Sequence, residues 1–417
     1  MKSFMRILLF ALASMLADFA TCHAGTTDVQ YLVTDLGTLR GSFVFASAIN
    51  NRGEVIGHST TNGTAAMHAF IYSNGALKDL GTLGGTNSYG YAINDSGQAV
   101  GAAYLSNGQS HGFLYSNGVM SDLGTLGGTG SDARAINNLG QIAGSAWTSN
   151  NAALHVYLLS GGVMNDLGTL GGQRATVYGL NDAGQIAGAS WPASGSIWHA
   201  FLYNGGAMND LGTLGGTSPY SYAYGINKDG LVVGKTSTSA SPEEAFVYQG
   251  GTMTDLGSLD LPGSTAHAIN SGGQIVGEAS VTNGLGSAAF IYTGGVMTDL
   301  NTLIPPNSGW ILEVATGIND SGQIIGVGTH PAGQERAFLL TPVPVLHISL
   351  TPTNTVLIQF TAQAGKGYIL EYRSAVSSGA WQPMLVLDPI PSIHPVVITD
   401  PVSPGTSARF YRVRTSY

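Results

Sequence analysis

Short runs of alternating apolar and polar residues, each ended by glycine or asparagine, recur between residues 35 and 340. In one stretch, residues 89–94 alternate and end in Asn94-Asp95-Ser96-Gly97. Such a run predicts a half-buried strand, and Gly97 suits the left-handed position of a hairpin with a bulge. Residues 98–102 and 111–115 predict two further strands, and a fourth leads to Asp122-Leu123-Gly124. The pattern predicts a unit of four antiparallel strands.

The four-strand unit repeats with a period of about 44 residues. Its Asp-Leu-Gly turn, Asp-Leu-Asn in the last copy, begins at Asp35, Asp79, Asp122, Asp166, Asp210, Asp255 and Asp299. An Ile-Asn or Leu-Asn pair ends the first strand of each copy, with its asparagine at Asn50, Asn94, Asn137, Asn181, Asn227, Asn270 and Asn319. A period of this length is typical of the blades of a β-propeller.

The first and last copies complete each other. Residues 31–36 resemble a fourth strand that lacks the three strands before it, whereas the seventh copy reaches Leu340 and then meets Thr341-Pro342. Because proline cannot continue a ladder, we expect the seventh copy to lack its own fourth strand. The sequence therefore predicts an all-β fold, a seven-bladed propeller over residues 25–340 closed by its N-terminal strand. An open β-solenoid and a ring with another blade count are the alternatives.

The repeat ends at residue 340, and the chain that follows predicts a second domain. Residues 341–345 form a proline-rich linker. Residues 346–417 contain short alternating or β-branched runs separated by Gly and Pro, which predicts a small β-sandwich of six or seven strands. Trp381 and the Phe410-Tyr411 pair are its expected core aromatic residues.

Residues 1–24 have the pattern of a signal peptide. Lys2 and Arg6 precede a short apolar run, and a small residue, Ala24, stands at the expected cleavage site. The apolar run is short for a membrane span, and Cys22 lies in a poor lipidation context. Cleavage after Ala24 would leave a mature chain with no cysteine, so disulfides would not stabilise it. We expect a secreted or cell-surface monomer, with the periplasm as an alternative destination.

Charge excludes one class of partner. The chain contains 15 Lys and Arg against 24 Asp and Glu, a formal net charge of −9, and it has no basic cluster. Nucleic acid is therefore not an expected partner. The 60 glycines stand at fixed phases of the repeat, which indicates turns rather than disorder.

The repeat resembles the HAF family of probable extracellular repeat proteins, whose His-Ala-Phe tripeptide stands here at His68-Ala69-Phe70 and His199-Ala200-Phe201. The Asp-Leu-Gly-Thr-Leu-Gly-Gly consensus is complete in four copies, beginning at Asp79, Asp122, Asp166 and Asp210. The resemblance covers about residues 31–340 and implies export, without an established activity. Residues 409–413, Arg-Phe-Tyr-Arg-Val, resemble the end of small fibronectin-like domains of bacterial secreted proteins. Copies five to seven depart from the family motif, with Glu244, Ala288 and Arg336 in place of histidine.

The repeated histidines and aspartates are interpreted as structural. Equivalent atoms of neighbouring blades lie too far apart for His68, His111, His155 and His199 to converge on one metal ion. We expect each of them to hydrogen-bond a neighbouring turn, and each Asp of Asp-Leu-Gly to accept backbone N–H groups. The Asn-Asp-x-Gly turns offer too few oxygens to argue for calcium. The sequence predicts no metal and no cofactor.

Residues that break the repeat where blades converge are the first candidate site. Two positions before each Ile/Leu-Asn pair, the residue differs from copy to copy: Ser47, Tyr91, Arg134, Tyr178, Tyr224, His267 and Thr316. With Asp132, the residues Arg134 and His267 could support acid/base chemistry on a sugar if the fold brought them together. Blade packing by tyrosines is the alternative interpretation.

The second candidate site is a set of aromatic residues in loops. Tyr104, Trp147 and Trp191 stand at one position of consecutive copies where other copies carry Ser or Thr, and Trp198 follows in the same loop as Trp191. Loops of this kind emerge on one face of a propeller, so the rings could stack on sugars or anchor a protein. Ordinary capping of the blades is the alternative.

The sequence favours a non-catalytic binding propeller that recognises a glycan or a surface protein through loops on one face. A structural role in the cell envelope, with the C-terminal domain as attachment module, is the second hypothesis. A carbohydrate-active enzyme is the third, because no nucleophile triad, metal cluster or phosphate loop stands out. Fold class alone does not decide among these functions.

Overall fold

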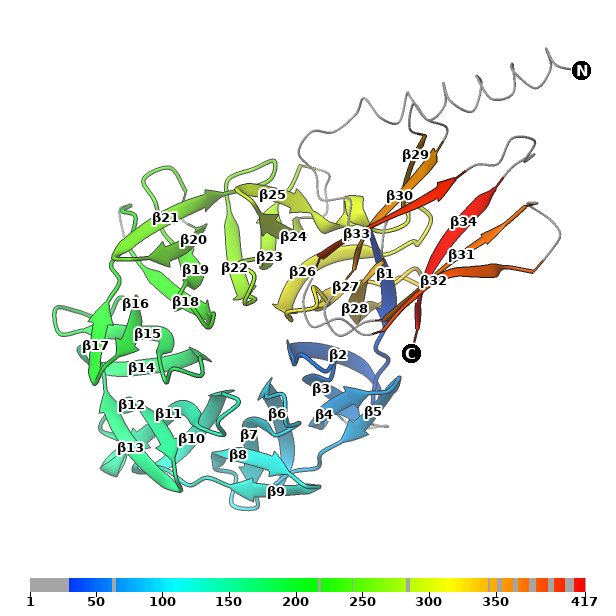
Figure 1. The fold of residues 1–417 in the computed structure, drawn as a ribbon. Coiled ribbons are helices and arrows are strands. Elements are labelled where there is room, and N and C mark those ends of the chain that lie inside the picture. The colour runs from blue at the N-terminus through cyan, green and yellow to red at the C-terminus, as the bar shows by residue number, and fades with distance from the viewer. Residues whose placement is uncertain are drawn as a thin grey trace, which may run out of the picture. The chain divides into compact units, whose positions relative to one another are not determined.

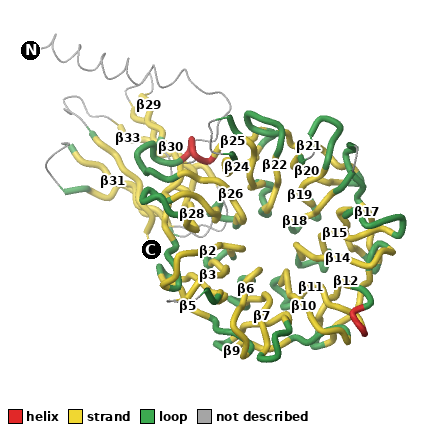
Figure 2. The backbone as a smooth tube through the Cα atoms, turned by 180° about the vertical axis from the view of Figure 1, so that it is seen from behind, coloured by secondary structure: helices red, strands yellow, loops and turns green. Residues whose placement is uncertain are grey.

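The computed structural model describes residues 30–61, 65–216, 219–241, 243–282, 286–343, 346–350, 355–362, 367–374, 380–388, 394–401 and 409–416. The expected signal peptide and Cys22 lie outside these residues. The described chain is all-β apart from two short helical turns, η1 (Ser149–Asn151) and η2 (Leu300–Leu303), drawn red in Figure 2. Within this part of the chain, no helix is long and apolar enough to cross a membrane. Residues Leu32–Thr341 form one compact unit, and Pro342–Tyr417 belong to the other.

The larger unit is a radial array of small antiparallel sheets around a common centre, the architecture of a β-propeller (Figure 1). The first two sheets contain β2 (Arg40–Ile49), β3 (Val55–Thr61), β4 (Met67–Ser73) and β5 (Ala76–Asp79), then β6 (Gly84–Ile93), β7 (Ala99–Leu105), β8 (Ser110–Ser116) and β9 (Val119–Asp122). Two four-strand groups joined by one parallel bridge follow as a single sheet: β10 (Gly127–Ile136), β11 (Ile142–Thr148), β12 (Leu154–Ser160) and β13 (Val163–Gly168), with β14 (Gly171–Leu180), β15 (Ile186–Pro192), β16 (His199–Asn204) and β17 (Ala207–Asp210).

Three more sheets complete the array. They contain β18 (Ser221–Ile226), β19 (Val232–Thr236), β20 (Glu244–Gln249) and β21 (Thr252–Gly257), then β22 (Ser264–Ile269), β23 (Ile275–Ser280), β24 (Ser287–Thr293) and β25 (Val296–Asp299), and finally β26 (Ile311–Ile318), β27 (Ile324–Thr329) and β28 (Glu335–Val343) with β1 (Gln30–Asp35). The innermost strands in Figure 1 are β2, β6, β10, β14, β18, β22 and β26.

The N-terminal strand lies in the last sheet, whose strand order is β1-β28-β27-β26. After β1, the N–H of Leu36 donates to the carbonyl of Ala337 at 3.1 Å. The N–H of Leu80 makes the same bond to Ala69 at 2.9 Å in the first sheet. The first strand of the chain therefore occupies, beside β28, the place that the fourth strand holds in the other sheets.

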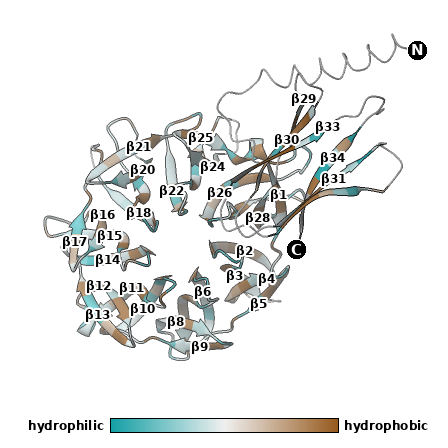
Figure 3. Ribbon diagram, in the orientation of Figure 1, coloured by the Kyte–Doolittle hydropathy of each residue, from teal (hydrophilic) through white to brown (hydrophobic). Residues whose placement is uncertain are grey.

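A phenylalanine-on-glycine contact explains two of the repeated positions. The third strand of each sheet carries a fully buried aromatic ring, at Phe70, Phe113, Tyr157, Phe201, Phe246, Phe290 and Phe338. In the fourth group, a Cβ added to Gly188 would lie 2.1 Å from the carbonyl oxygen of Thr176 and 2.6 Å from the ring of Phe201. Only glycine leaves room there for both the neighbouring strand and the ring. Both hydrophobic and hydrophilic residues occur on the strands of the array (Figure 3).

The turns follow the predicted chemistry. Gly97 has a φ of 77°, and the Asn74-Gly75 turn has φ values of 51° and 80°, so the predicted left-handed positions are confirmed. The Asp79 carboxylate accepts the N–H of Gly81 at 2.8 Å, which is the predicted use of the Asp-Leu-Gly aspartate. One boundary was predicted wrongly, because β28 continues past Leu340 to Val343. Its register with β27 nevertheless ends at Leu340, just before the proline at position 342.

The C-terminal unit contains two three-stranded sheets, ordered β29-β30-β33 and β32-β31-β34. Their strands are β29 (His347–Leu350), β30 (Thr355–Ala362), β31 (Gly367–Arg373), β32 (Gln382–Leu387), β33 (His394–Pro401) and β34 (Phe410–Ser416). The buried aromatic residues here are Phe360 and Tyr368, 2% and 1% exposed, rather than Trp381. Trp381 is instead covered by the guanidinium groups of Arg373 and Arg412, 4.5 and 4.3 Å from the ring centroid, because it precedes β32 and lies outside the inward-facing positions of the strands.

Candidate functional site

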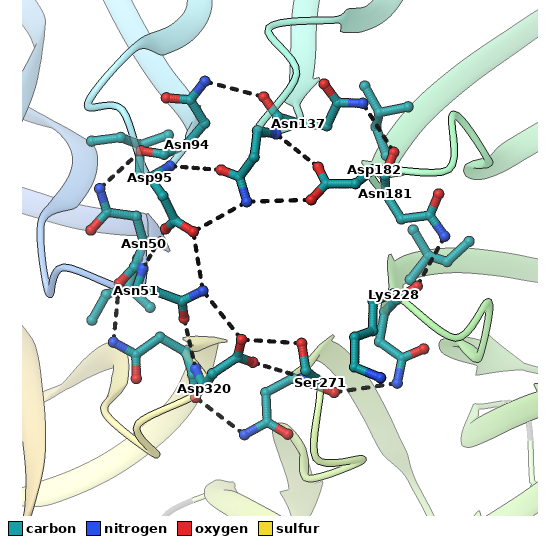
Figure 4. Close-up of a pocket in the computed structure, with 18 of the residues that line it drawn as sticks. Asn50, Asn51, Asn94, Asp95, Asn137, Asn181, Asp182, Lys228, Ser271 and Asp320 are labelled. Atoms are coloured by element: carbon teal, nitrogen blue, oxygen red, sulfur yellow. Dashed lines mark hydrogen bonds between the residues drawn. The ribbon is translucent and has the colours of Figure 1, made fainter. Parts of the chain in front are cut away.

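A ring of asparagine side chains joins the innermost strands at one end. We call the seven asparagines of the Ile/Leu-Asn pairs the asparagine ring. Each side-chain amide donates to the backbone carbonyl of the equivalent asparagine in the next sheet, at distances from 2.9 to 3.3 Å (Figure 4). The last of these bonds runs from Asn319 to the carbonyl of Asn50, 3.0 Å away. The bonds therefore form a complete circuit between the first and last copies of the repeat.

The same amides hold the turns that follow them. The side-chain oxygen of Asn50 accepts the N–H groups of Arg52 and Glu54 at 3.0 and 2.9 Å. All seven asparagines are buried, with 3 to 6% of their surface exposed. Since each amide uses both its donor and its acceptor within the protein, the ring is a structural element rather than a ligand site.

A second circle of side chains lines a polar cavity of about 260 Å³ beside the asparagine ring (Figure 4). It consists of the residues that follow the ring asparagines: Asn51, Asp95, Asn138, Asp182, Lys228, Ser271 and Asp320. The N–H of Asn51 donates to Asp95 at 2.8 Å, and the N–H of Asp95 donates to Asn138 at 2.9 Å. Asparagines and aspartates thus alternate as donors and acceptors until Lys228 interrupts the circle.

A one-residue bulge aims the variable positions of the innermost strands. In the second sheet Gly90 pairs with Gly101 and Ala92 with Val100, so Tyr91 has no partner in the register. The equivalent shift occurs at Ser47, Arg134, Tyr178, Tyr224, His267 and Thr316. Bulges re-aim side chains and are frequent beside functional sites. The sequence identified these positions by their variability, but not the bulge that sets them apart.

Five of the bulged residues form one connected series of contacts, Tyr91, Arg134, Tyr178, Tyr224 and His267. The Arg134 guanidinium lies 4.5 Å from the ring centroid of Tyr91 and 5.8 Å from that of Tyr178, and its Nε donates to Asp132 at 2.8 Å. Burial would lower the pKa of Arg134, but Asp132 raises it above its usual range. Burial also raises the pKa of the Tyr91 and Tyr178 hydroxyls. The arginine is therefore charged and already neutralised by Asp132.

Tyr224 connects this group to the next sheet. Its ring centroid lies 4.9 Å from that of Tyr178, in an edge-on arrangement, and 5.6 Å from that of His267. His267 pairs with Glu278, 3.3 Å away. Among the described contacts, those of Arg134 and Asp132 do not reach His267, so the acid/base cluster considered from the sequence is not assembled.

The loop aromatics meet around an unexpected arginine. The Arg174 guanidinium, at the start of β14, lies 5.6 Å from the ring centroid of Trp147 and 5.3 Å from that of Trp191. Trp191 packs edge-on against Trp198 at 5.6 Å, and Trp198 lies 5.9 Å from Tyr222 of the following sheet. Tyr104, in β7, is half-buried and makes no ring contact with these residues in the described part of the chain. The structure thus connects Trp147, Trp191 and Trp198, but not Tyr104.

A pocket of about 380 Å³ opens beside these rings, lined by Tyr220, Tyr222, Tyr224 and Lys235. Tyr222 stacks on Tyr224 with ring centroids 5.9 Å apart and planes 9° apart. Lys235 donates to Glu243 at 2.7 Å and lies 5.9 Å from the Tyr222 ring. We call the connected residues the aromatic cluster: Trp147, Arg174, Trp191, Trp198, Tyr220, Tyr222, Tyr224 and Lys235.

The charges at this pocket are paired within the protein. Burial alone would raise the pKa of Glu243, but hydrogen bonds from Lys235 and Thr265 and the charges of Lys235 and His267 lower it. Burial raises the pKa of Tyr222 to about 12, with neighbouring tyrosines contributing. At neutral pH the pocket therefore presents neutral tyrosines beside a compensated Lys-Glu pair.

The aromatic cluster extends away from the asparagine ring along the inner strands. Tyr224 is three residues from Asn227, whereas Arg174 in β14 is seven residues from Asn181, which in an extended strand corresponds to roughly 20 Å. Tyr220, Tyr222, Lys235 and Arg174 were not among the residues predicted from sequence. The spacing of the tyrosines could have identified them, since Tyr220, Tyr222 and Tyr224 occupy every second position, the pattern of side chains on one face of a strand.

The repeated histidines lie where the structural interpretation predicts. His68, His111, His155 and His199 each bond the aspartate of their own Asp-Leu-Gly turn, at 2.8 to 2.9 Å. Within the described residues, no group of three or more His, Cys, Asp or Glu side chains could hold a metal ion.

Comparisons with known proteins add limited information. No protein-family model matches the chain, and no curated protein matches it in sequence. Among solved structures, the β-propeller domain of the Trilobed protease from Pyrococcus furiosus is similar at 9% identity and a TM-score of 0.47, over 72% of this chain and 94% of that one. TolB from Acinetobacter baumannii is similar at 12% identity and a TM-score of 0.37, over 69% and 80% of the two chains. A lectin from Aleuria aurantia, in complex with Fucα1-6GlcNAc, is similar at 12% identity and a TM-score of 0.32, over 70% and 93%. Since these TM-scores lie below 0.5, the three likenesses carry no argument about what this chain binds.

Proposed function

We propose that residues 25–340 form an exported seven-bladed β-propeller, closed by its N-terminal strand, that binds a glycan through the aromatic cluster without catalysis. The asparagine circuit from Asn319 back to Asn50 and the bond from Leu36 to Ala337 support closure of the ring. The leader pattern of residues 1–24 and the resemblance to the HAF repeats support export.

The observation that carries the binding proposal is the pocket beside the stacked tyrosines. Aromatic rings offer flat apolar faces to the C–H faces of sugars, and polar groups at the ring edges fix orientation. Tyr220, Tyr222 and Tyr224 provide such faces around about 380 Å³, a volume within the range of small-ligand sites. The tryptophans of the two preceding sheets extend the surface, which suits several sugar units of a polymer.

Catalysis is disfavoured by the pairing of the charged groups. Glycoside hydrolysis needs two carboxyl groups facing one substrate, one of them available as an acid. Here Asp132 is bound to Arg134, Glu243 to Lys235, and Glu278 to His267, at 2.8, 2.7 and 3.3 Å. The described carboxylates near the cluster therefore each serve a local partner.

The proposal is tested with purified residues 25–417 on an array of bacterial and plant polysaccharides. Tyr222→Ala and Trp191→Ala remove rings from the two halves of the cluster, and Tyr203→Ala in β16 removes a ring of the same type that makes no contact with the cluster among the described residues. Only variants whose unfolding midpoint stays within about 5 °C of the wild type are compared.

We expect the wild type and Tyr203→Ala to bind the same glycans, and both cluster variants to lose about fivefold or more in affinity, since stacking on one ring contributes on the order of 1 kcal/mol or more. Absence of binding by the wild type to any polysaccharide, or undiminished binding by both cluster variants, would refute the proposal.

A further inference from the structure

The basic side chains around the aromatic cluster differ in whether a carboxylate neutralises them. Arg134 and Lys235 are neutralised by Asp132 and Glu243. Arg174 is exposed, and in the described part of the chain its guanidinium contacts two tryptophan rings and has no carboxylate partner. A positive charge without a partner on a protein of net charge −9 leaves an uncompensated cation beside the proposed glycan site.

The N–H donors of Arg174 are available. Its guanidinium lies 5.6 and 5.3 Å from the ring centroids of Trp147 and Trp191, and among the described residues its N–H groups make no hydrogen bond. Five N–H donors in one plane are therefore left for a ligand. A planar fork of donors matches the two oxygens of a carboxylate.

From this we infer that the glycan is acidic, and that Arg174 binds the carboxylate of a uronic acid residue while the rings of the aromatic cluster stack on the sugars beside it. The inference rests on the proposed function and narrows its ligand class. The planar fork of an arginine is pre-organised, so a bidentate bond costs little conformational entropy for each hydrogen bond formed. The ionic repulsion expected between a net negative protein and a polyanion makes general charge attraction a poor substitute for this contact.

The test compares three polymers on residues 25–417: polygalacturonate, the same polymer after chemical reduction of its carboxyl groups, and dextran sulfate. Binding is measured by isothermal titration at fixed ionic strength for the wild type, Arg174→Gln and Arg174→Lys. Since Arg174 is exposed, both variants are expected to keep the unfolding midpoint of the wild type.

We expect polygalacturonate to bind at least tenfold more tightly than either the reduced polymer or dextran sulfate. Arg174→Gln should abolish this preference, and Arg174→Lys should lose most of it, because an ammonium offers no planar fork. Equal affinity of the wild type for the reduced polymer would overturn the inference and leave glycan binding intact. Equal affinity for dextran sulfate, or full binding by Arg174→Lys, would overturn the carboxylate fork. If none of the polymers binds and the polysaccharide array is also negative, the proposed function fails as well.

Discussion

Replacing Asn319 with alanine tests whether the repeat region is a closed ring. Asn319 donates to the carbonyl of Asn50 at 3.0 Å and to Gln323 at 2.9 Å, and it accepts from Ser321 and from the N–H of Gln323, both at 2.9 Å. Within the ring, Asn137 makes the matching set, with 3.1 Å to the next carbonyl and 2.7 Å to Gln141. Asn137 accepts the N–H of Leu139 at 3.1 Å where Asn319 accepts the Ser321 hydroxyl, and otherwise the two residues differ in that Asn319 lies at the seam between the first and last copies.

The expected magnitude follows from the groups left behind. Asn137→Ala leaves the N–H groups of Leu139 and Gln141 without their acceptor, at about 1–3 kcal/mol each, and removes one of the two bonds to the carbonyl of Asn181, so it should cost roughly 2–6 kcal/mol of unfolding free energy. In a closed ring Asn319→Ala should cost the same within about 0.5 kcal/mol. In an open array Asn319 would have no acceptor across the seam, and its loss should cost less by about one hydrogen bond, roughly 1 kcal/mol.

The assay is urea unfolding of residues 25–417, followed by tryptophan fluorescence, for the wild type and both variants. Equal midpoints and equal slopes for the two variants agree with the ring. A midpoint for Asn319→Ala that remains closer to the wild type by 1 kcal/mol or more refutes closure and returns the open solenoid to consideration.

Three other predictions concern packing, pH and the cavity. Gly188→Ala should lower the unfolding free energy by at least about 3 kcal/mol, because the new Cβ overlaps with Thr176 and Phe201. Gly195→Ala should change the thermal midpoint by little, because nothing lies within 4 Å of its new Cβ. Similar midpoints for the two variants would contradict the packing argument. Burial among Phe43, Phe45 and Tyr89 lowers the pKa of His58 to about 4, so the unfolded chain takes up a proton below about pH 6.5 that the folded chain takes up only below about 4. The free energy of unfolding should therefore decrease by up to about 3 kcal/mol as the pH falls from about 6.5 to about 4, and His58→Leu should remove this decrease. An unchanged pH profile of this variant in urea unfolding would exclude His58 as the source of the decrease. Lys228→Asn should raise the thermal midpoint, because the asparagine provides an acceptor for the N–H of Asp182, worth about 1 kcal/mol. Lys228→Asp should raise the midpoint less, because two carboxylates then lie side by side. The reverse order of the two midpoints would show that the circle of side chains is not electrostatically coupled.

The sequence predicted the repeated parts of the fold because each repeated residue has a local physical task. Asp79 closes its own turn, and Asn94 holds the turn that follows it, so their spacing alone indicated the strands. The position of β28 beyond Leu340 was missed because its last residues no longer pair with β27, and proline is tolerated where no ladder bond is required.

The candidate site was predicted in part. Trp147, Trp191 and Trp198 were found because they interrupt a repeat, and the structure brings them together. Arg174 escaped notice because Trp147 and Trp191 lie on other strands, so no spacing along the chain reveals that two indoles flank it. Tyr104 was included by its place in the repeat, but among the described residues no ring or cation contact joins it to the aromatic cluster.

Two positions of the inner strands differ in how far the repeat allows their residues to vary. At the asparagine ring every copy must make the same bond to the next, so variation there breaks the circuit and the residue is asparagine in all seven copies. In the circle beside it, alternation of Asn and Asp cannot close over an odd number of members, and Lys228 and Ser271 stand where the alternation stops. Three residues before the ring asparagine, the bulge turns one side chain per copy away from the ladder. Ser47, Arg134 and Tyr224 can therefore differ without disturbing the strands that carry them, and Tyr224 is the bulged residue that joins the aromatic cluster.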